Sequence, residues 1–157
     1  MAQKLIVIVG LGALGSEVLT FARNWDCRFK IIDFDRVEQK NTQAQMHGRM
    51  SLRKNKAQAI AQQMNGMWGL RVEAVPHKLT EDNMEQLLGG AHLILDCTDN
   101  IAARMVIKDF KHIHHDVEVL HGALSAAGDF ARVMWTEQFA PDAEGAEGEA
   151  TCEDGEQ

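Results

Sequence analysis

Three glycines in the segment Val9-Gly10-Leu11-Gly12-Ala13-Leu14-Gly15 decide the fold of this 157-residue chain. A buried-strand pattern precedes the glycines and a helical pattern follows them, which is the context that a dinucleotide fingerprint requires. Gly10 permits the tight turn, Gly12 lets a phosphate approach the backbone, and Gly15 lets helix and strand pack closely. The N–H groups that open the helix then face an anion. The segment predicts a nucleotide site in a Rossmann-type domain; the alternative is a glycine-rich turn that binds no ligand.

The rest of the body alternates between strand-like and helix-like segments. This alternation predicts an α/β fold, with a Rossmann-like, doubly wound, mainly parallel sheet and helices on both faces. We expect strands over residues 4–9, 29–33, 70–75, 93–96, 117–120 and 130–135. We expect helices over residues 13–24, 51–65, 80–88 and 100–111, with Ser51 and Thr80 as helix caps. The apolar stripe of the first helix is expected at Leu14, Val18, Phe21 and Trp25.

The net charge of −7 is unevenly distributed along the chain. Residues 1–137 carry 16 acids and 16 bases, whereas residues 138–157 carry seven acids and no base. We therefore expect one domain over residues 1–138 and an acidic, mobile tail over residues 139–157. A neutral body offers no general attraction to nucleic acid. Residues 5–9 are too short an apolar run for a signal peptide and no stretch has bilayer length, so we expect a cytoplasmic protein without a membrane partner.

The identity of the nucleotide depends on residues beyond the glycine loop. Asp33 lies 18 residues after Gly15, where an acid accepts hydrogen bonds from a ribose, but NAD, FAD and ATP all carry one. A long polar loop over residues 34–50 replaces the sharp turn that is usual in dehydrogenases. Lys56 shares an apolar stripe with Leu52 and Ile60, so its ammonium either extends from the helix start to water or meets an anion such as phosphate.

Two carboxylates at the end of a central strand point to magnesium. Asp96 and Asp99 follow the strand over residues 93–96 and are expected to face the nucleotide crevice. Magnesium needs few protein carboxylates, because it shares its coordination shell with phosphates and water. The alternative is that Asp99 or Asn100 caps the following helix. These features together favour ATP with magnesium over NAD.

Five motifs occur in order and at matching spacing over about residues 4–121: Val9-Gly10-Leu11-Gly12-Ala13-Leu14-Gly15, Ile32-Asp33-Phe34-Asp35-Arg36-Val37-Glu38, Asn41 with Gln45, Lys56-Ala57, and Leu95-Asp96-Cys97-Thr98-Asp99-Asn100. With them the chain resembles the ThiF/MoeB family, whose fold is shared with ubiquitin-activating enzymes. The resemblance implies that ATP and magnesium are bound and that the C-terminal glycine of a small ubiquitin-like or sulfur-carrier protein is adenylated.

The resemblance also implies a role for each matching residue. Lys56 and Asp99 would be the catalytic residues, with Asp99 holding magnesium and Lys56 contacting the phosphates. Asp33 would hold the ribose, and Asp35 would lie in the same nucleotide site. The glycines and the polar loop would supply the remaining phosphate contacts, through Gly10, Gly12, Gly15 and Asn41.

The chain departs from this family at several positions. Ala44 stands where the family usually has an arginine that reaches phosphates, and Arg36, Arg49 and Arg53 are the candidate substitutes. The zinc-binding Cys-x-x-Cys set is absent, because Cys27, Cys97 and Cys152 are isolated. Acidic neighbours of Cys152 raise a thiol pKa, so we expect it to be inert. The histidines form no zinc pattern and are expected at a solvated strand entry; they are His112, His114, His115 and His121.

Two alternative functions remain open, and the resemblance also leads to an expectation about the oligomeric state. The absence of the arginine at Ala44 motivates a nucleotide-binding pseudoenzyme or scaffold, and the glycine loop alone motivates an NAD-dependent oxidoreductase. The resemblance implies a homodimer or a complex with a related subunit. A group of adaptable apolar residues either serves such an interface or completes the core; its members are Met46, Met50, Met64, Met67 and Trp68.

Overall fold

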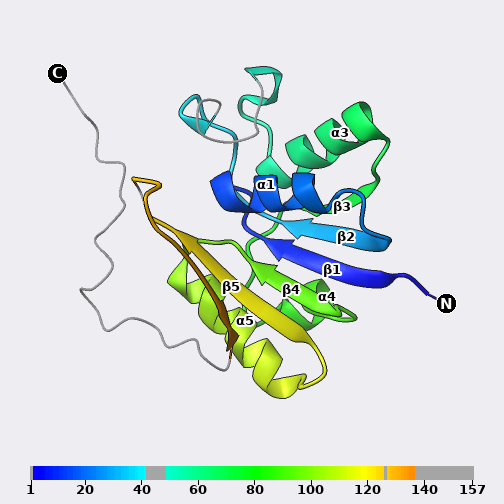
Figure 1. Ribbon diagram of the computed structural model, residues 1–157, viewed down its shortest axis with the longest axis vertical. Helices are drawn as coiled ribbons and strands as arrows, with labels where there is room; N and C mark the ends of the chain where they lie inside the picture. The colour runs from blue at the N-terminus through cyan, green and yellow to red at the C-terminus, as the bar shows by residue number, and fades with distance from the viewer. Residues whose placement is uncertain (1, 42–48, 126, 137–157) are drawn as a thin grey trace.

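One six-stranded sheet, in the order β3-β2-β1-β4-β5-β6, organises the computed structural model, which describes residues 2–41, 49–125 and 127–136 (Figure 1). The first five strands run parallel, and β6 pairs with β5 in the antiparallel sense. This strand order is that of the doubly wound Rossmann fold, with its switch point between β1 and β4. The predicted fold class is confirmed. The strands are β1 Lys4–Val9, β2 Cys27–Ile32, β3 Val72–Val75, β4 Leu93–Asp96, β5 Glu118–Leu124 and β6 Ala131–Trp135.

Helices cover both faces of the sheet. Helices α1 and α3 lie on one face and helices α4 and α5 on the other (Figure 1). Successive side chains of β1 point to opposite faces, so the strand serves two cores. Ile8 packs in the cluster that contains Ile60 of α3, and Val7 packs in the cluster that contains Ile107 of α5. The helices are α1 Ala13–Ala22, α3 Lys56–Trp68, α4 Met84–Leu88 and α5 Ile101–Ile113, and a short 3₁₀ turn covers Arg49–Ser51.

The predicted apolar stripe of α1 is wrong at Phe21 and Trp25, whereas Leu14 and Val18 are half-buried and Val18 packs against the core. Phe21 is 77% exposed, whereas Leu19 is fully buried and Ala22 nearly so. The contact face is set by Gly15, because its missing side chain allows the helix to approach β1 closely. Leu19 and Ala22 follow Gly15 at helical spacing and therefore point to the sheet. Trp25 lies beyond the end of the helix and is also exposed.

Two predicted helix starts are also wrong. Helix α3 begins at Lys56, because the side chain of Asn55 accepts a hydrogen bond of 3.1 Å from the Gln58 N–H and so caps the helix. Just before it, Arg53 has a φ of 67°, in the left-handed region, which prevents a helix from running through from Ser51. Helix α4 begins at Met84, beyond Thr80, which does not act as its cap.

The remaining boundaries differ from the predictions by a few residues. Strand β5 continues to Leu124, because its last residues pair with β6. The predicted acidic tail lies outside the described residues. Among the helices that the structure describes, none has both the length and the apolar character needed to cross a membrane.

Candidate functional site

The glycine loop packs directly against the turn that follows β4. Gly10 has a φ of +87°, and a Cβ on it would lie 2.8 Å from the N and Cα atoms of Thr98. A Cβ on Gly15 would overlap the carbonyl oxygen of Gly10. Gly12 occupies the N-cap position of α1 and makes no side-chain cap, so the first N–H groups of the helix border the loop. Gly10 and Gly15 are therefore required for the close packing of the loop, and the N–H groups at the start of α1 are the feature that fits a phosphate group.

Asp33 borders the glycine loop at the carboxyl end of β2. Its Oδ2 accepts a hydrogen bond of 2.7 Å from the Leu11 N–H, and its Oδ1 accepts one of 2.8 Å from the Asp35 N–H. Burial raises the pKa of Asp33, and the two backbone N–H donors and the charge of Lys56 oppose that shift. Each carboxylate oxygen retains capacity for a further donor, such as a ribose hydroxyl.

Lys56 lies beside Asp35 at the first turn of α3. Its Nζ is 3.5 Å from Asp35 Oδ2, and its backbone N–H donates a hydrogen bond of 2.8 Å to the Asp35 carbonyl. The side chain of Asn55 fixes this arrangement by donating to the carbonyls of Asp33 and Asp35, at 2.7 and 3.2 Å. Lys56 is buried and Asp35 is exposed. The structure thus brings Asp33, Asp35 and Lys56 together, as the sequence predicted.

The predicted helical stripe is confirmed for Lys56 and Ile60, which are both buried in α3, and is wrong only for Leu52. Leu52 precedes the helix and is exposed, so it shares no helical stripe with Lys56. Asn41 is buried, and its Oδ1 accepts a hydrogen bond of 2.8 Å from the Glu38 N–H, so its side chain closes a local turn. The role of Asn41 toward phosphate stays a prediction.

Two of the three arginines considered as substitutes for Ala44, Arg36 and Arg53, contact each other, and the third, Arg49, lies in the 3₁₀ turn Arg49–Ser51. Arg36 Nη1 donates a hydrogen bond of 2.8 Å to the Arg53 carbonyl, and both residues are exposed. Ala44 lies outside the described residues, as do Gln45 and Met46. Whether either arginine takes the place of the one missing at Ala44 stays a prediction.

The turn after β4 contains one exposed and one buried carboxylate. Asp99 is exposed, and a single such carboxylate suits a magnesium ion that shares its shell with phosphates and water. Asp96 is fully buried and points into the protein, so the expectation that it faces the crevice is wrong. Asn100 caps α5, because its Oδ1 accepts a hydrogen bond of 3.1 Å from the Ala103 N–H. Residues 2–41, 49–125 and 127–136 contain no group of three His, Cys, Asp or Glu side chains that would hold a metal alone.

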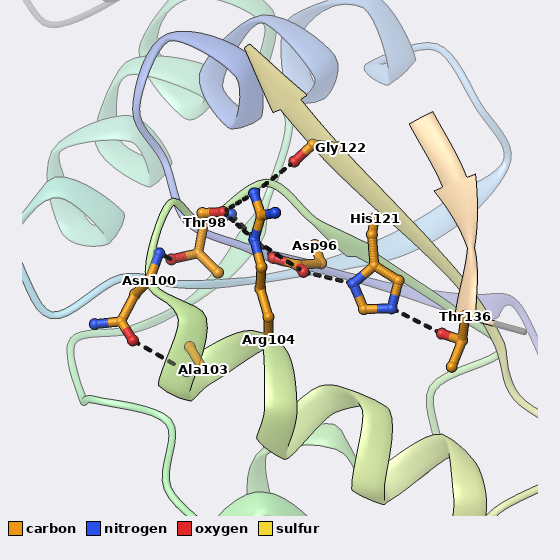
Figure 2. Close-up of polar contacts among 8 residues, drawn as sticks. All are labelled: Asp96, Thr98, Asn100, Ala103, Arg104, His121, Gly122 and Thr136. Carbon is orange, nitrogen blue, oxygen red and sulfur yellow. Dashed lines mark hydrogen bonds and ion pairs between the residues drawn. The ribbon is translucent and has the colours of Figure 1, made fainter. Parts of the chain in front are cut away.

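A buried polar network, made by Asp96, Thr98, Arg104, His121 and Thr136, lies behind this turn (Figure 2). His121 Nδ1 is 2.6 Å from Asp96 Oδ2, and His121 Nε2 is 2.8 Å from Thr136 Oγ1. A carboxylate, an imidazole and a hydroxyl follow one another in the same order in the catalytic triads of hydrolases, where the hydroxyl is the nucleophile. All three side chains are buried, so the network holds strands together and does not present a nucleophile to substrate.

The sequence-based placement of His121 at a solvated strand entry is wrong. His121 is 3% exposed and follows the buried residues Val117 and Val119 at the two-residue spacing of one strand face. That alternation was the signal that could have identified it. His112 and His115 are exposed as expected. His114 Nε2 is 2.8 Å from Glu85 Oε1.

The described cysteines are poor nucleophiles. Burial, and secondarily the charge of Asp96, raises the pKa of Cys97 to about 12. Burial likewise raises the pKa of Cys27, with a contribution from Asp26. A thiol of such a pKa is protonated at neutral pH. Cys152, which we predicted to be inert, lies outside the described residues.

Comparison with known proteins identifies related sequences. The model of the ThiF family matches residues 1–151. An adenylyltransferase and sulfurtransferase, MOCS3, of Aedes aegypti is 32% identical over 113 residues, which are 69% of this chain and 26% of that protein. A molybdopterin-synthase adenylyltransferase of Haemophilus influenzae is 31% identical over 127 residues, which are 78% of this chain and 51% of that protein.

Solved structures show the same architecture. Those of the E. coli tRNA N6-threonylcarbamoyladenosine dehydratase with AMP and with ATP match with TM-scores of 0.69 and 0.68. Each is 25% identical to this chain and covers 78% of it, and the match covers 52% of the dehydratase. The chain thus matches 26% to 52% of the length of these relatives.

Proposed function

The chain belongs to the ThiF family, and we propose that it uses ATP and magnesium to adenylate the C-terminal glycine of a small ubiquitin-like or sulfur-carrier protein. The observation that carries the proposal is the meeting of the glycine loop, Asp33 and Lys56 at one edge of the sheet. Relatives named as adenylyltransferases and related structures solved with AMP and ATP support it.

The proposed reaction needs charge stabilisation more than it needs a base. A C-terminal carboxylate has a pKa of about 3.5, so it is already ionised at neutral pH. One of its oxygens forms a bond to the α-phosphorus of ATP, and the bond from that phosphorus to the bridging oxygen of pyrophosphate breaks. Magnesium supplies positive charge to the phosphates. Lys56 supplies the second positive charge. Because Lys56 is buried, this charge stabilises the reacting phosphates more strongly than an exposed charge would.

The other residues of the site bind and orient the nucleotide. The N–H groups of the glycine loop face the phosphates, and the Asp33 carboxylate accepts hydrogen bonds from the ribose hydroxyls. Asp35 is exposed and holds the Lys56 ammonium near the site before ATP arrives. Asp99 holds the magnesium ion from the turn after β4.

ATP with magnesium is expected to stabilise the protein and NAD is not. The physical reason is that Lys56 and Asp99 match a triphosphate with its metal, whereas they offer nothing to a nicotinamide. At about 100 times its dissociation constant, a ligand that binds only the folded state adds about 2.7 kcal/mol to the free energy of unfolding. Thermal unfolding with each nucleotide measures this. Stabilisation by NAD and not by ATP would instead support the oxidoreductase alternative.

A nucleotide-binding pseudoenzyme is the second candidate, because Ala44 replaces a phosphate-binding arginine of the family. The two functions differ in turnover. An adenylyltransferase exchanges labelled pyrophosphate into ATP when a carrier protein ending in Gly-Gly is present, whereas a pseudoenzyme binds ATP and shows no exchange. The assay needs both ATP binding and exchange to be measured on the same preparation.

We also propose that the protein works as a homodimer. Met50, Met67 and Trp68 are exposed apolar side chains, which fits an interface. Met64 belongs to the core, which is the other alternative that the sequence left open for this group. A partner subunit would also offer a basic residue, such as Arg53, to a site that lacks the arginine at Ala44.

Sedimentation over a range of protein concentrations, with and without ATP, is expected to show a dimer. Replacing Met67 with glutamate is expected to weaken dimerisation, because it places a charge on the exposed apolar surface. Gln63→Glu, on the same helix, controls for the added charge. A wild-type protein that stays monomeric throughout and still exchanges pyrophosphate contradicts the proposal.

A further inference from the structure

Asp96 is a fully buried carboxylate whose two oxygens have different partners. Oδ2 lies 2.6 Å from His121 Nδ1 and 3.8 Å from Arg104 Nε, and Oδ1 accepts a hydrogen bond of 3.1 Å from the Thr98 N–H (Figure 2). A buried charge is costly unless it is paired and hydrogen-bonded. The partners of Asp96 therefore fix its orientation, and its orientation in turn fixes the Thr98 amide.

The His121 ring is held on both sides. Its Nε2 lies 2.8 Å from Thr136 Oγ1, and Thr136 follows β6 directly. When the Thr136 hydroxyl donates to Nε2, the ring proton is on Nδ1 and is donated to Asp96, so every group has a partner. The same arrangement, a second-layer group that sets the tautomer and direction of a histidine, is common around metal sites.

Arg104 holds the same turn from the opposite side. Its Nε and Nη2 donate hydrogen bonds of 2.9 and 2.7 Å to the Thr98 carbonyl, and Nη2 donates one of 3.1 Å to the Gly122 carbonyl. Thr98 Oγ1 accepts a further hydrogen bond of 3.1 Å from the Asn100 N–H. Both neighbours of Asp99 are thus fixed, while the Asp99 side chain is exposed.

We infer that His121 is a positioning residue for the Asp99 magnesium ligand. It acts through Asp96 and Thr98: the ring orients the Asp96 carboxylate, the carboxylate holds the Thr98 amide, and the turn presents Asp99 to the nucleotide edge. The inference rests on the proposed function, because that function assigns magnesium to Asp99. Loss of the Asp96–His121 hydrogen bond therefore raises the magnesium concentration that ATP binding requires, without removing any group that touches ATP.

Two amide variants separate the two sides of the ring. Asparagine at position 121 places its NH₂ group where Nδ1 lies, and glutamine places its NH₂ group where Nε2 lies. His121→Asn keeps the donor to Asp96 and is expected to leave the magnesium concentration for half-maximal ATP binding within about twofold of wild type. His121→Gln loses that donor and is expected to raise this concentration about tenfold, the smallest change usual for a direct partner of a metal ligand, because His121 acts on Asp99 only through Asp96 and Thr98. Titration calorimetry of ATP at several magnesium concentrations measures both.

Thr136 variants test the same chain of contacts without altering the ring. Thr136→Val removes the hydroxyl at nearly constant volume, and Thr136→Ser keeps the hydroxyl. Valine is expected to raise the half-maximal magnesium concentration several-fold, as a partial loss of a second-layer contact does. Serine is expected to restore the wild-type value. This pair keeps the test available if either His121 variant fails to fold.

Hydrogen exchange of the Thr98 amide gives a readout that does not involve nucleotide. It is expected to be faster in His121→Gln than in His121→Asn, because only the glutamine variant loses the short hydrogen bond to Asp96 and leaves its carboxylate held by Arg104 alone at Oδ2. A purely structural role would lower the thermal stability of both variants and leave the magnesium dependence unchanged, which would overturn the inference. If the wild-type protein binds no ATP, the proposed function and the metal role of Asp99 fall together, and the exchange rate alone shows whether His121 holds the turn.

Discussion

Replacing Lys56 with alanine is expected to lower the rate of pyrophosphate exchange about 10²- to 10³-fold, the usual loss for one preorganised group that stabilises transition-state charge. The ammonium is buried, so water screens its charge on the reacting phosphates little. It lies 3.5 Å from Asp35 and contributes to the electrostatic environment of Asp33. No other described lysine combines burial with a position at this edge of the sheet.

Stability is expected to change little in the same variant. Asp35, the ion-pair partner that Lys56→Ala leaves behind, is exposed. The buried Asp33 loses the nearby charge of Lys56 but keeps its two backbone N–H donors. We expect the free energy of unfolding to fall by less than about 1 kcal/mol, as for other partly solvated ion pairs. Urea denaturation beside the exchange assay separates a catalytic loss from a folding loss.

Lys54→Ala is the matched control for this experiment. Lys54 is two residues away, is exposed, and its Nζ donates a hydrogen bond of 3.2 Å to Gln62 Oε1. Its removal changes the net charge by the same amount and is expected to leave the exchange rate within about twofold, because surface charges are screened by solvent. Equal rates in wild type and Lys56→Ala would show that the Lys56 ammonium only pairs with Asp35.

Gly15→Ala is expected to destabilise the fold by about 3 kcal/mol or more, at or above the usual upper end for an added methyl group in a packed site. The new Cβ would overlap the carbonyl oxygen of Gly10 and lie 3.2 Å from the Cβ of Cys97. The first obstacle is backbone, so no side chain can rotate away. Helix α1 must move off β1, and the glycine loop then loses its shape for phosphate. ATP binding is therefore expected to be lost with the stability.

Gly66→Ala in α3 is the same substitution, but it is expected to have the opposite effect on the free energy of unfolding. A Cβ on Gly66 meets nothing within 4 Å, and the residue lies inside a helix. Alanine is a better helix former than glycine, so this variant is expected to gain about 0.5–1 kcal/mol. Denaturant unfolding without nucleotide measures both variants. A Gly15→Ala protein as stable as wild type would show that α1 does not need its close approach to β1.

The sequence by itself determined the fold class, a doubly wound and mainly parallel sheet. It also determined the edge of the sheet at which the candidate nucleotide-binding residues lie. Both follow from local signals: the apolar run before Gly10, the glycine spacing, and the alternation of strand and helix patterns. In such a sheet the carboxyl ends of β1, β2 and β4 meet at the switch point, so the alternation of elements is enough to assign Asp33 and the Asp99 turn to one edge. Lys56 also lies at that edge, as predicted, on a buried stripe of α3 that it shares with Ile60 but not with Leu52.

Packing decided which face of each element is buried. The sequence pattern predicted a buried face of α1 that included Phe21, which the structure exposes. Close contact at Gly15 selects a different face, since a helix can approach β1 only where it has no side chain. Tertiary contacts also decided which residue caps α3. Asn55 caps α3 because its amide also satisfies the carbonyls of Asp33 and Asp35, which Ser51 does not.

Only the tertiary structure could reveal the buried network of Asp96, Arg104, His121 and Thr136. These residues are separated by up to 40 positions, and no spacing rule links them. The sheet places β4 beside β5 and β5 beside β6, so Asp96 pairs with His121 in register and Thr136 follows the strand next to it. Burial then changes what each side chain can do. An exposed carboxylate can bind a metal ion, whereas a buried carboxylate needs a counter-charge and hydrogen bonds from the protein. His121 and Arg104 supply these to Asp96.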